Sequence, residues 1–206
     1  RRLPGSGTTR FNQASVEAEH VDDFADRFRD QTAFYQHVLL ATLAGIGRAV
    51  TRDAAQGVAA RKRIYSHGNA PQVRQDPQVL QVVGQISSWS FAVEAAVQQA
   101  TLSLQRAWEL HDSADEAAVL QANIDAEVDA ARAQVIASEL VPRAATELFN
   151  ALGASDTRVS KALDRHWRNA RTVSSHNPVI YKARNVGDWE VNSHQPTFIW
   201  QIGNGE

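Results

Sequence analysis

Cysteine and methionine are both missing from the 206 residues. Without cysteine the chain forms no disulfide framework, no thiolate metal site and no cysteine nucleophile, and a reducing compartment such as the cytoplasm is the expected location. A translated chain begins with methionine unless it is trimmed, whereas position 1 here is arginine. We therefore expect this chain to be a processed or cleaved piece of a longer protein.

An excess of positive charge is also lacking, because 21 Lys and Arg face 23 Asp and Glu, for a formal net charge of -2. No global positive field exists to hold a nucleic acid or an anionic membrane. No apolar run approaches the roughly 20 residues that a bilayer-spanning helix needs. With 43% hydrophobic residues the chain can still bury a core, so we expect a globular domain with neither a nucleic-acid nor a membrane partner.

The sequence motifs of several enzyme classes are absent. The seven histidines form no H-E-x-x-H pair and are not accompanied by carboxylates at metal-ligand spacing, so we expect no metal. The patterns G-x-S-x-G, G-x-x-x-x-G-K and G-x-G-x-x-G are missing as well. The chain therefore carries none of the familiar hydrolase or nucleotidase signatures.

Two long helices are expected first. Apolar residues at steps of three and four predict one helix from about Ala33 to about Tyr65 and another from Pro77 to about Leu110. Asp76 is an N-cap candidate directly before Pro77, where the first helical position tolerates proline. Each helix would have roughly 34 residues and a length of about 50 Å.

A third helix is expected from the capping-box spacing of Ser113 and Glu116. Pro142 interrupts its apolar pattern, and because a proline inside a helix removes one backbone hydrogen bond, we expect a kink or an end near Ser138. A further helical stretch is expected to reach Leu152.

A fourth helix is expected to begin at Ser155 or Asp156 and to continue to about Val173. After it, the pattern supports at most a short helix over residues 179–187. Long helices with short connections are typical of an up-down-up-down four-helix bundle. The predicted fold class is therefore mainly α.

The chain divides into three predicted parts: residues 1–30, a bundle over 31–187, and a tail over 188–206. The first part carries a turn at residues 5–7 that feeds a short extended segment, which we interpret as the end of a β-strand. The tail is irregular and contains Trp189, Phe198 and Trp200. Since these aromatic residues are too apolar for a free tail, we expect it to lie along a surface or a neighbouring subunit.

The densest polar and aromatic segment runs from residue 163 to 178, LDRHWRNARTVSSHNP. Arg165, Arg168 and Arg171 are spaced to lie near one side of a helix, where anions or partner carboxylates would compensate them. His176 follows the helix end, and a neutral imidazole there can donate or accept a proton near pH 7. The alternative is a solvated helix face followed by a polar loop.

Two further segments are candidate anion sites. Gly153, Ala154 and Ser155 stand at an expected helix start, where free backbone amides favour an anion such as phosphate; the alternative is an ordinary capped helix. Arg61 and Arg63 follow the first long helix, where they can hold phosphate or can equally stabilise the helix C-terminus.

The segment from 163 to 182, LDRHWRNARTVSSHNPVIYK, closely resembles the C-terminal signature of flavin-dependent monooxygenases in the acyl-CoA dehydrogenase superfamily, the branch that contains dibenzothiophene monooxygenase. Residues 5–8 with Phe11 resemble the last strand of that family's middle β-domain, and residues 60–63 with 148–157 resemble its flavin-contacting stretches. The resemblance covers nearly the whole chain. It implies the C-terminal half of such a protein, without the N-terminal helical domain and most of the β-domain.

The resemblance also implies roles for two loop residues. His176 falls on the family's loop histidine, which is proposed to sit by the flavin ring and to assist protonation there. Asn177, expected among the cofactor contacts, stands where acyl-CoA dehydrogenases carry a catalytic glutamate. Because asparagine cannot abstract an α-proton as a base, the resemblance disfavours simple acyl-CoA dehydrogenation.

The same resemblance implies which residues contact the flavin phosphate. Arg61 or Arg63 matches the arginine that contacts it, and the register between the two stays open. Gly153, Ala154 and Ser155 match the loop that reaches the flavin of a neighbouring subunit. Close relatives can place arginine at the position of Ser155, so this contact is expected to be weaker here or to be made by backbone amides.

The function implied is that of the oxygenase component of a two-component flavin-dependent monooxygenase. Reduced flavin, either FMN or FAD, would come from a separate flavin reductase, and one oxygen atom of O2 would go to an aromatic or organosulfur small molecule. The family packs its C-terminal bundles into a homotetramer. Two alternatives stay open: an acyl-CoA dehydrogenase-like flavin oxidoreductase, and a non-catalytic oligomerisation fragment when the chain is isolated.

Overall fold

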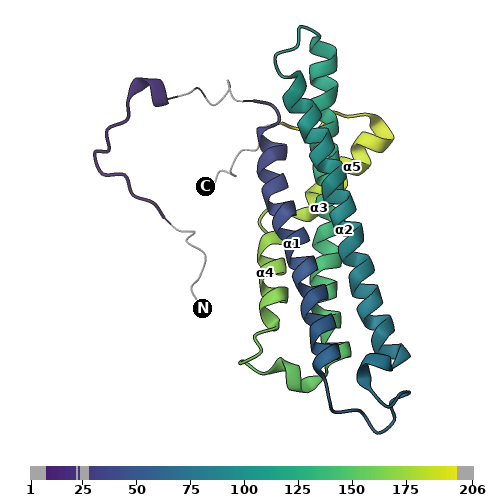
Figure 1. Cartoon of the computed structure of the whole chain (residues 1–206). Coiled ribbons are helices and arrows are strands. Elements are labelled where there is room, and N and C mark those ends of the chain that lie inside the picture. Colours follow the sequence, from purple (N-terminus) through teal and green to yellow (C-terminus); the bar gives the residue numbers. More distant parts are fainter. Residues whose placement is uncertain (1–7, 22, 24–27, 199–206) are drawn as a thin grey trace.

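The computed structural model describes residues 8–21, 23 and 28–198, and the elements in these ranges are helical (Figure 1). The α-helices are α1 (Gln31–Ala60), α2 (Pro77–Leu110), α3 (Glu116–Leu152), α4 (Asp164–Ser174) and α5 (Val179–Asn192), and the short 3-10 helices are η1 (Ala18–His20), η2 (Val73–Gln75) and η3 (Ala154–Thr157). No strand occurs within these ranges. None of their helices is long and apolar enough to cross a membrane.

Helices α1 to α4 run alternately up and down one bundle (Figure 1). The three long helices have 30, 34 and 37 residues and pack against one another, with α3 in contact with both other long helices and with α4 and α5. Helix α4 has only 11 residues and packs on α1 and α3, whereas α5 packs on α3. The predicted mainly α, up-down-up-down bundle is confirmed, with a fourth helix much shorter than the other three.

The core of the bundle is rich in alanine, which lets helix backbones approach closely. Leu40, Ile86 and Leu148 are fully buried among many alanines of α1 and α3. Gly57 marks a close approach of α1 to α3, because a Cβ atom added there would lie 2.6 Å from Cδ2 of Leu152. The packing of the C-terminal part of α1 against Leu152 therefore requires a residue without a side chain at position 57.

Helix α1 ends earlier than predicted. The expected end at Tyr65 is wrong, since α1 stops at Ala60 and Arg61 is already extended, with φ -74° and ψ 121°. The Arg61 side chain binds carbonyl groups at the end of α3, and Ile64 and Tyr65 are exposed. No buried face is available beyond Ala60 to continue the helix.

Helix α2 begins as predicted, with the Asp76 carboxylate accepting from the backbone N–H of Gln78 at 2.9 Å. Helix α3 uses a different cap from the predicted one. Asp115, not Ser113, accepts from the N–H of Ala118, at 3.0 Å. The Ser113 hydroxyl instead accepts from the N–H of Asp115.

Pro142 does not end α3, which continues unbroken to Leu152. Of the kink or end expected near Ser138, the end is wrong because buried side chains flank the proline on both sides. Val141 and Leu148 are essentially fully buried, and burying such a side chain is worth about 1.5–3 kcal/mol. Their burial offsets the roughly 3 kcal/mol that an interior proline costs.

The fourth helix does not begin at Ser155 or Asp156. Those residues form η3, and α4 begins at Asp164. The intervening chain turns at Ala162, whose positive φ of 50° breaks any continuous helix. A helix start at Ser155 is thus replaced by a short turn and a loop.

Helix α5 continues past the expected end at residue 187, to Asn192, where Ser193 takes a left-handed conformation with φ 54°. Trp189 therefore belongs to a helix and not to the irregular tail. Phe198 lies back on α1, since its carbonyl accepts from the Thr32 hydroxyl at 2.5 Å. The expected strand end at residues 5–7 and Trp200 both lie outside the described residues, and residues 8–11 are irregular.

Candidate functional site

A hollow of about 460 Å³ opens beside the C-terminal end of α1. It gathers residues from the end of α1, from η3 and from the loop before α4. Three of the residues singled out from the sequence, Arg61, Arg63 and Ser155, line it together. Its other lining residues are Gly57, Ala60, Lys62, Asp156, Arg158 and Lys161.

The Arg61 side chain forms hydrogen bonds within the protein. Its Nη1 donates to the carbonyl of Leu152 at 2.6 Å and to that of Ala151 at 3.3 Å, so it caps the end of α3. Gly153 lies directly against it, because a Cβ atom added there would meet Nη2 of Arg61 at 3.3 Å. Arg63, by contrast, is exposed, which leaves it as the more accessible guanidinium of the two.

The small residues that follow α3 form a tight turn. Gly153 has φ 78° and ψ 179°, a backbone conformation that favours glycine. Ala154 and Ser155 are exposed in η3, and the Thr157 hydroxyl donates to the carbonyl of Ala154 at 2.7 Å. Ser155 faces the hollow, whereas Ala154 is not among its lining residues.

The charge of the hollow suits a phosphate ester. Five cationic side chains line it against one carboxylate, that of Asp156, which lies 3.9 Å from Lys161 Nζ. Arg63 and Arg158 form no salt bridge within the described ranges. Sequence reasoning missed Arg158 and Lys161, because isolated charges in a loop carry no spacing signal. The residues present therefore fit a bound phosphate group.

His176 lies in the loop between α4 and α5, and its side chain is exposed. Its backbone N–H donates to the carbonyl of Val173 at 3.2 Å. An exposed imidazole in this position can exchange protons with a molecule bound against the loop. The structure thus places it on the surface of the bundle and outside its core.

Asn177 is turned inward. Its side-chain Nδ2 donates to Gln36 Oε1 of α1 at 2.6 Å, and its carbonyl accepts from Gln134 Nε2 of α3 at 2.9 Å. Both glutamines are almost completely buried. The structure therefore uses the Asn177 amide to attach the loop to the bundle.

The predicted catalytic and phosphate residues lie at opposite ends of α1. The loop with His176 is attached at Gln36, and Arg61 follows the last residue of α1, Ala60. At 1.5 Å per residue these points are about 36 Å apart. That separation exceeds the length of a flavin mononucleotide, so the two groups of one chain cannot contact the same molecule.

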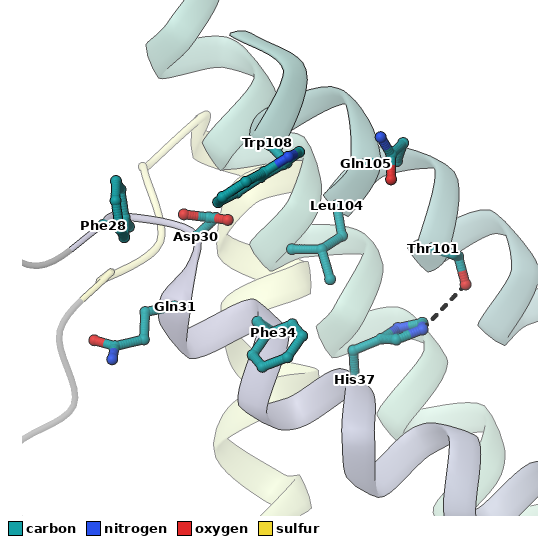
Figure 2. Close-up of a pocket in the computed structure, with 9 residues that line it drawn as sticks. All are labelled: Phe28, Asp30, Gln31, Phe34, His37, Thr101, Leu104, Gln105 and Trp108. Atoms are coloured by element: carbon teal, nitrogen blue, oxygen red, sulfur yellow. Dashed lines mark hydrogen bonds between the residues drawn. The ribbon is translucent and has the colours of Figure 1, made fainter. Parts of the chain in front are cut away.

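A second, apolar hollow of about 560 Å³ lies between the first turns of α1 and the last turns of α2. Figure 2 shows the rings of Phe28, Phe34 and Trp108 around it, with Leu104 between them and His37 at one end. It is at the same end of α1 as the His176 loop, because Gln36 and His37 are neighbours in the sequence. None of the predicted site residues lines it.

The hydrogen bonds of His37 indicate that Nε2 carries a proton. The Thr101 hydroxyl donates to the carbonyl of Val97 at 2.8 Å, so it can only accept from His37 Nε2, 3.0 Å away. Nδ1 of His37 then keeps its lone pair, and no partner occurs for it among the described residues. Burial lowers the pKa of His37, which keeps the ring neutral.

Asp53 of α1 ties α4 to the bundle. Arg165 Nη2 and His166 Nε2 lie 2.5 and 2.9 Å from Oδ2 of Asp53. Burial alone would raise the pKa of Asp53, but hydrogen bonds from His166 and Arg52 and the nearby Arg165 charge lower it overall. Arg168 pairs with Asp164 at 3.3 Å. Two of the three arginines of the predicted row, Arg165 and Arg168, thus have carboxylate partners within their own chain.

A buried ion pair joins α3 to α5. Lys182 Nζ lies 3.9 Å from Glu127 Oε2, and both residues are 2% exposed. Burial raises the pKa of Glu127 to about 7, although the Lys182 charge and a hydrogen bond from the Ala33 backbone oppose the rise. Burial likewise lowers the pKa of Lys182. Periodicity could not reveal this pair, because charged helix residues are expected at the surface.

The chain is similar in sequence to monooxygenases. The chain is 27% identical over 205 residues to a dibenzothiophene monooxygenase of Mycolicibacterium goodii, covering 95% of this chain and 48% of the relative. It is 30% identical over 203 residues to the probable FMNH2-dependent monooxygenase SfnC of Pseudomonas putida, covering 95% and 50%. The chain thus spans about half the length of the curated relatives it matches.

Solved structures of similar fold are monooxygenases as well. Methanesulfinate monooxygenase MsuC of Pseudomonas fluorescens matches with a TM-score of 0.74 and 28% identity, over 82% of this chain and 43% of that one. FMN-bound TdsC of Paenibacillus sp. A11-2 matches with a TM-score of 0.71 and 30% identity, over 81% and 40%. The resemblance to the monooxygenase branch is confirmed.

Residues 37–180 match the family described as acyl-CoA dehydrogenase, C-terminal domain. This segment makes up more than half of the chain and contains most of α1, all of α2 and α3, the cationic hollow and the His176 loop. The chain therefore belongs to the acyl-CoA dehydrogenase C-terminal domain family.

Proposed function

We propose that the protein containing this chain is the oxygenase component of a two-component flavin-dependent monooxygenase. A separate flavin reductase in the cytoplasm supplies reduced flavin, FMN in the first instance, and the substrate is an aromatic or organosulfur small molecule. The monooxygenase relatives support this, since one is described as FMNH2-dependent and another acts on dibenzothiophene. An FMN-bound structure of similar fold supports the choice of flavin.

The observation that carries the proposal is the cationic hollow at the end of α1. Arg63, Arg158 and Lys161 line it, and only one carboxylate balances them and the two other cations. A dianionic phosphate monoester bound there would satisfy guanidinium and ammonium groups together, as charge-assisted hydrogen bonds require. Ser155 adds a hydroxyl group to the same lining. These residues would hold the phosphate end of the flavin.

Reduced flavin, when bound, supplies the electrons and activates O2. The chain's own residues bind, orient and move protons. The exposed imidazole of His176 donates or accepts a proton at a ring nitrogen. Asn177 offers no carboxylate at the next position, and its amide is held by Gln36. Protonation of an oxygen atom fits this loop better than abstraction of a carbon-bound proton does.

The distance along α1 supports a shared site between subunits. Because the His176 loop and the cationic hollow of one chain are about 36 Å apart, a flavin that meets both must lie between two copies. We propose a homotetramer in which each flavin takes its phosphate contacts from one chain and its imidazole from another. Symmetric association of this kind repeats the same shared site in every copy.

The apolar hollow beside His37 supports an aromatic class of substrate. It offers aromatic side chains from α1 and α2 and a neutral imidazole at the same end of α1 as the His176 loop. Apolar clefts of a few hundred cubic ångströms with a few polar groups are typical small-molecule sites.

The full-length protein with reduced FMN, O2 and dibenzothiophene tests the proposal. His176→Ala should lower the yield of oxygenated product per flavin oxidised by about tenfold or more and raise hydrogen peroxide release. His67→Ala, in an exposed loop, is the matched control and should change neither. Unchanged product yield in the His176 variant would remove this residue from the role. Rapid flavin reduction by an acyl-CoA would favour the dehydrogenase alternative instead.

A further inference from the structure

Two buried glutamines from different helices converge on one loop residue. Gln36 of α1 and Gln134 of α3 are 3% and 1% exposed. Burying a primary amide costs free energy unless it forms hydrogen bonds. Both amides form one with Asn177, at 2.6 and 2.9 Å.

The direction of one bond is fixed by chemistry. The Asn177 carbonyl can only accept, so Gln134 must present its NH2 group to it. Pro178 follows and disfavours a helical conformation for Asn177. On the other side, the His176 N–H is bound to the carbonyl of Val173. The backbone of His176 is therefore held from both directions.

The His176 ring has no comparable support of its own, since no side-chain hydrogen bond of His176 occurs in the described part of the chain. Its position depends on the backbone around it. Catalytic groups need placement within about 0.5 Å to act efficiently. Attachment of the adjacent residue to α1 and α3 supplies this placement.

We propose that Gln36 and Gln134 are positioning residues that hold His176 through Asn177. The inference rests on the proposed function of His176 and extends it to two core residues that touch neither substrate nor cofactor. Asn177 then acts as the anchor of the loop and not as a flavin contact. These hydrogen bonds connect α1, α3 and the loop between α4 and α5, which are far apart in the sequence.

Hydrogen exchange in the full-length protein tests the placement without using activity. Gln134→Met and Gln36→Met keep the side-chain length but remove the amide. The backbone amides of residues 175–177 and 179–181 should exchange on the order of tenfold faster in both variants, as expected for the loss of a buried hydrogen bond. Asn123→Leu is the matched control, because Asn123 is a buried α3 amide that binds Val119 of its own helix. Unchanged exchange, or an equal rise in the control, would overturn the proposal.

A double-mutant cycle with His176→Ala separates positioning from general stability. With reduced FMN, O2 and dibenzothiophene, Gln134→Met should lower the product yield per flavin several-fold in the otherwise unchanged protein and have no further effect beside His176→Ala. An equal loss in both backgrounds would show a merely structural role and contradict the proposal. If His176→Ala alone leaves the yield unchanged, the proposed function of His176 fails, and hydrogen exchange still decides whether the glutamines hold the loop.

Discussion

Arg61 donates a 2.6 Å hydrogen bond to the carbonyl of Leu152, so the residue that follows α1 also caps the end of α3. Arg63, two positions later, is exposed. The two arginines are therefore expected to serve different purposes, although both are candidates for the phosphate contact.

Replacing each arginine by alanine should separate these purposes. Arg61→Ala should lower the free energy of unfolding by about 1–3 kcal/mol, because it removes a charged donor from buried carbonyl groups. Arg63→Ala should change stability by less than about 0.5 kcal/mol and weaken FMN binding. Chemical denaturation and flavin fluorescence titration of the full-length protein measure both quantities.

Riboflavin provides the control for the Arg63 variant, because it lacks the phosphate. Its affinity should stay unchanged while that of FMN falls. An equal loss for both flavins would show that Arg63 does not act through the phosphate.

Mixed oligomers test whether one flavin site is built by two chains. Neither His176→Ala nor an Arg63→Ala, Arg158→Ala double variant should support normal oxygenation alone. Coexpressed, they should recover a measurable part of the activity, since some sites then combine an intact imidazole with an intact cationic hollow. A chain carrying all three changes, coexpressed with the His176 variant, is the control and should recover none. No recovery in the first mixture would contradict the shared site.

The pH dependence of stability should report on the buried ion pair of Glu127 and Lys182. The folded-state pKa of Glu127, about 7, lies above its ordinary value of 4.5. The stability linked to its proton is therefore fully present below about pH 4.5 and is lost as the pH rises through 7. Lys182→Met removes the cation that opposes this rise, so the pKa of Glu127 should increase further.

Lys182→Met should thus cost about 1–1.5 kcal/mol more at pH 8 than at pH 5, because Glu127 titrates at about 7 beside Lys182 and has to keep its proton at pH 8 once the cation is gone. Urea denaturation at the two pH values measures the difference. Lys161→Met, at an exposed position, should show no such widening. A cost that is equal at both pH values would count against a titrating Glu127.

Gly57→Ala should destabilise the bundle by about 1–3 kcal/mol, because the new methyl group would meet Leu152 at 2.6 Å. Gly84→Ala is the control: it lies in α2 with nothing within 4 Å of an added Cβ, and alanine should stabilise the helix there by about 0.5–1 kcal/mol. Thermal unfolding measures both. Combination with Leu152→Ala should reduce the cost of the Gly57 change.

The start of α2 could be predicted because its signal is local. Asp76 and Pro77 are adjacent, and their side chains alone favour a helix beginning there. The continuation of α3 through Pro142 could not be predicted from the sequence, because it depends on Val141 and Leu148 packing against other helices. The early end of α1 likewise depends on a bond from Arg61 to a residue 91 positions away.

In the candidate site too, some residues could be predicted from the sequence and others depend on contacts between distant parts of the chain. Arg61, Arg63 and Ser155 were candidates from their positions at expected helix ends and from the family resemblance, and the structure places them around one hollow. Gln36 and Gln134 had no such signal, because a glutamine within an apolar helix pattern is indistinguishable from a surface residue. Only the fold shows that both bind Asn177, at separations of 141 and 43 positions.

The unbroken length of α1 restricts how this protein can vary over evolution. Adding or deleting a single residue within α1 would rotate one end by about 100° relative to the other and shift it by 1.5 Å. In the proposed shared site, neighbouring copies could then no longer present an imidazole and a basic cluster to one ligand. Length changes should therefore accumulate in the connection after Arg63, over residues 64–72, and be rare between Gln36 and Ala60.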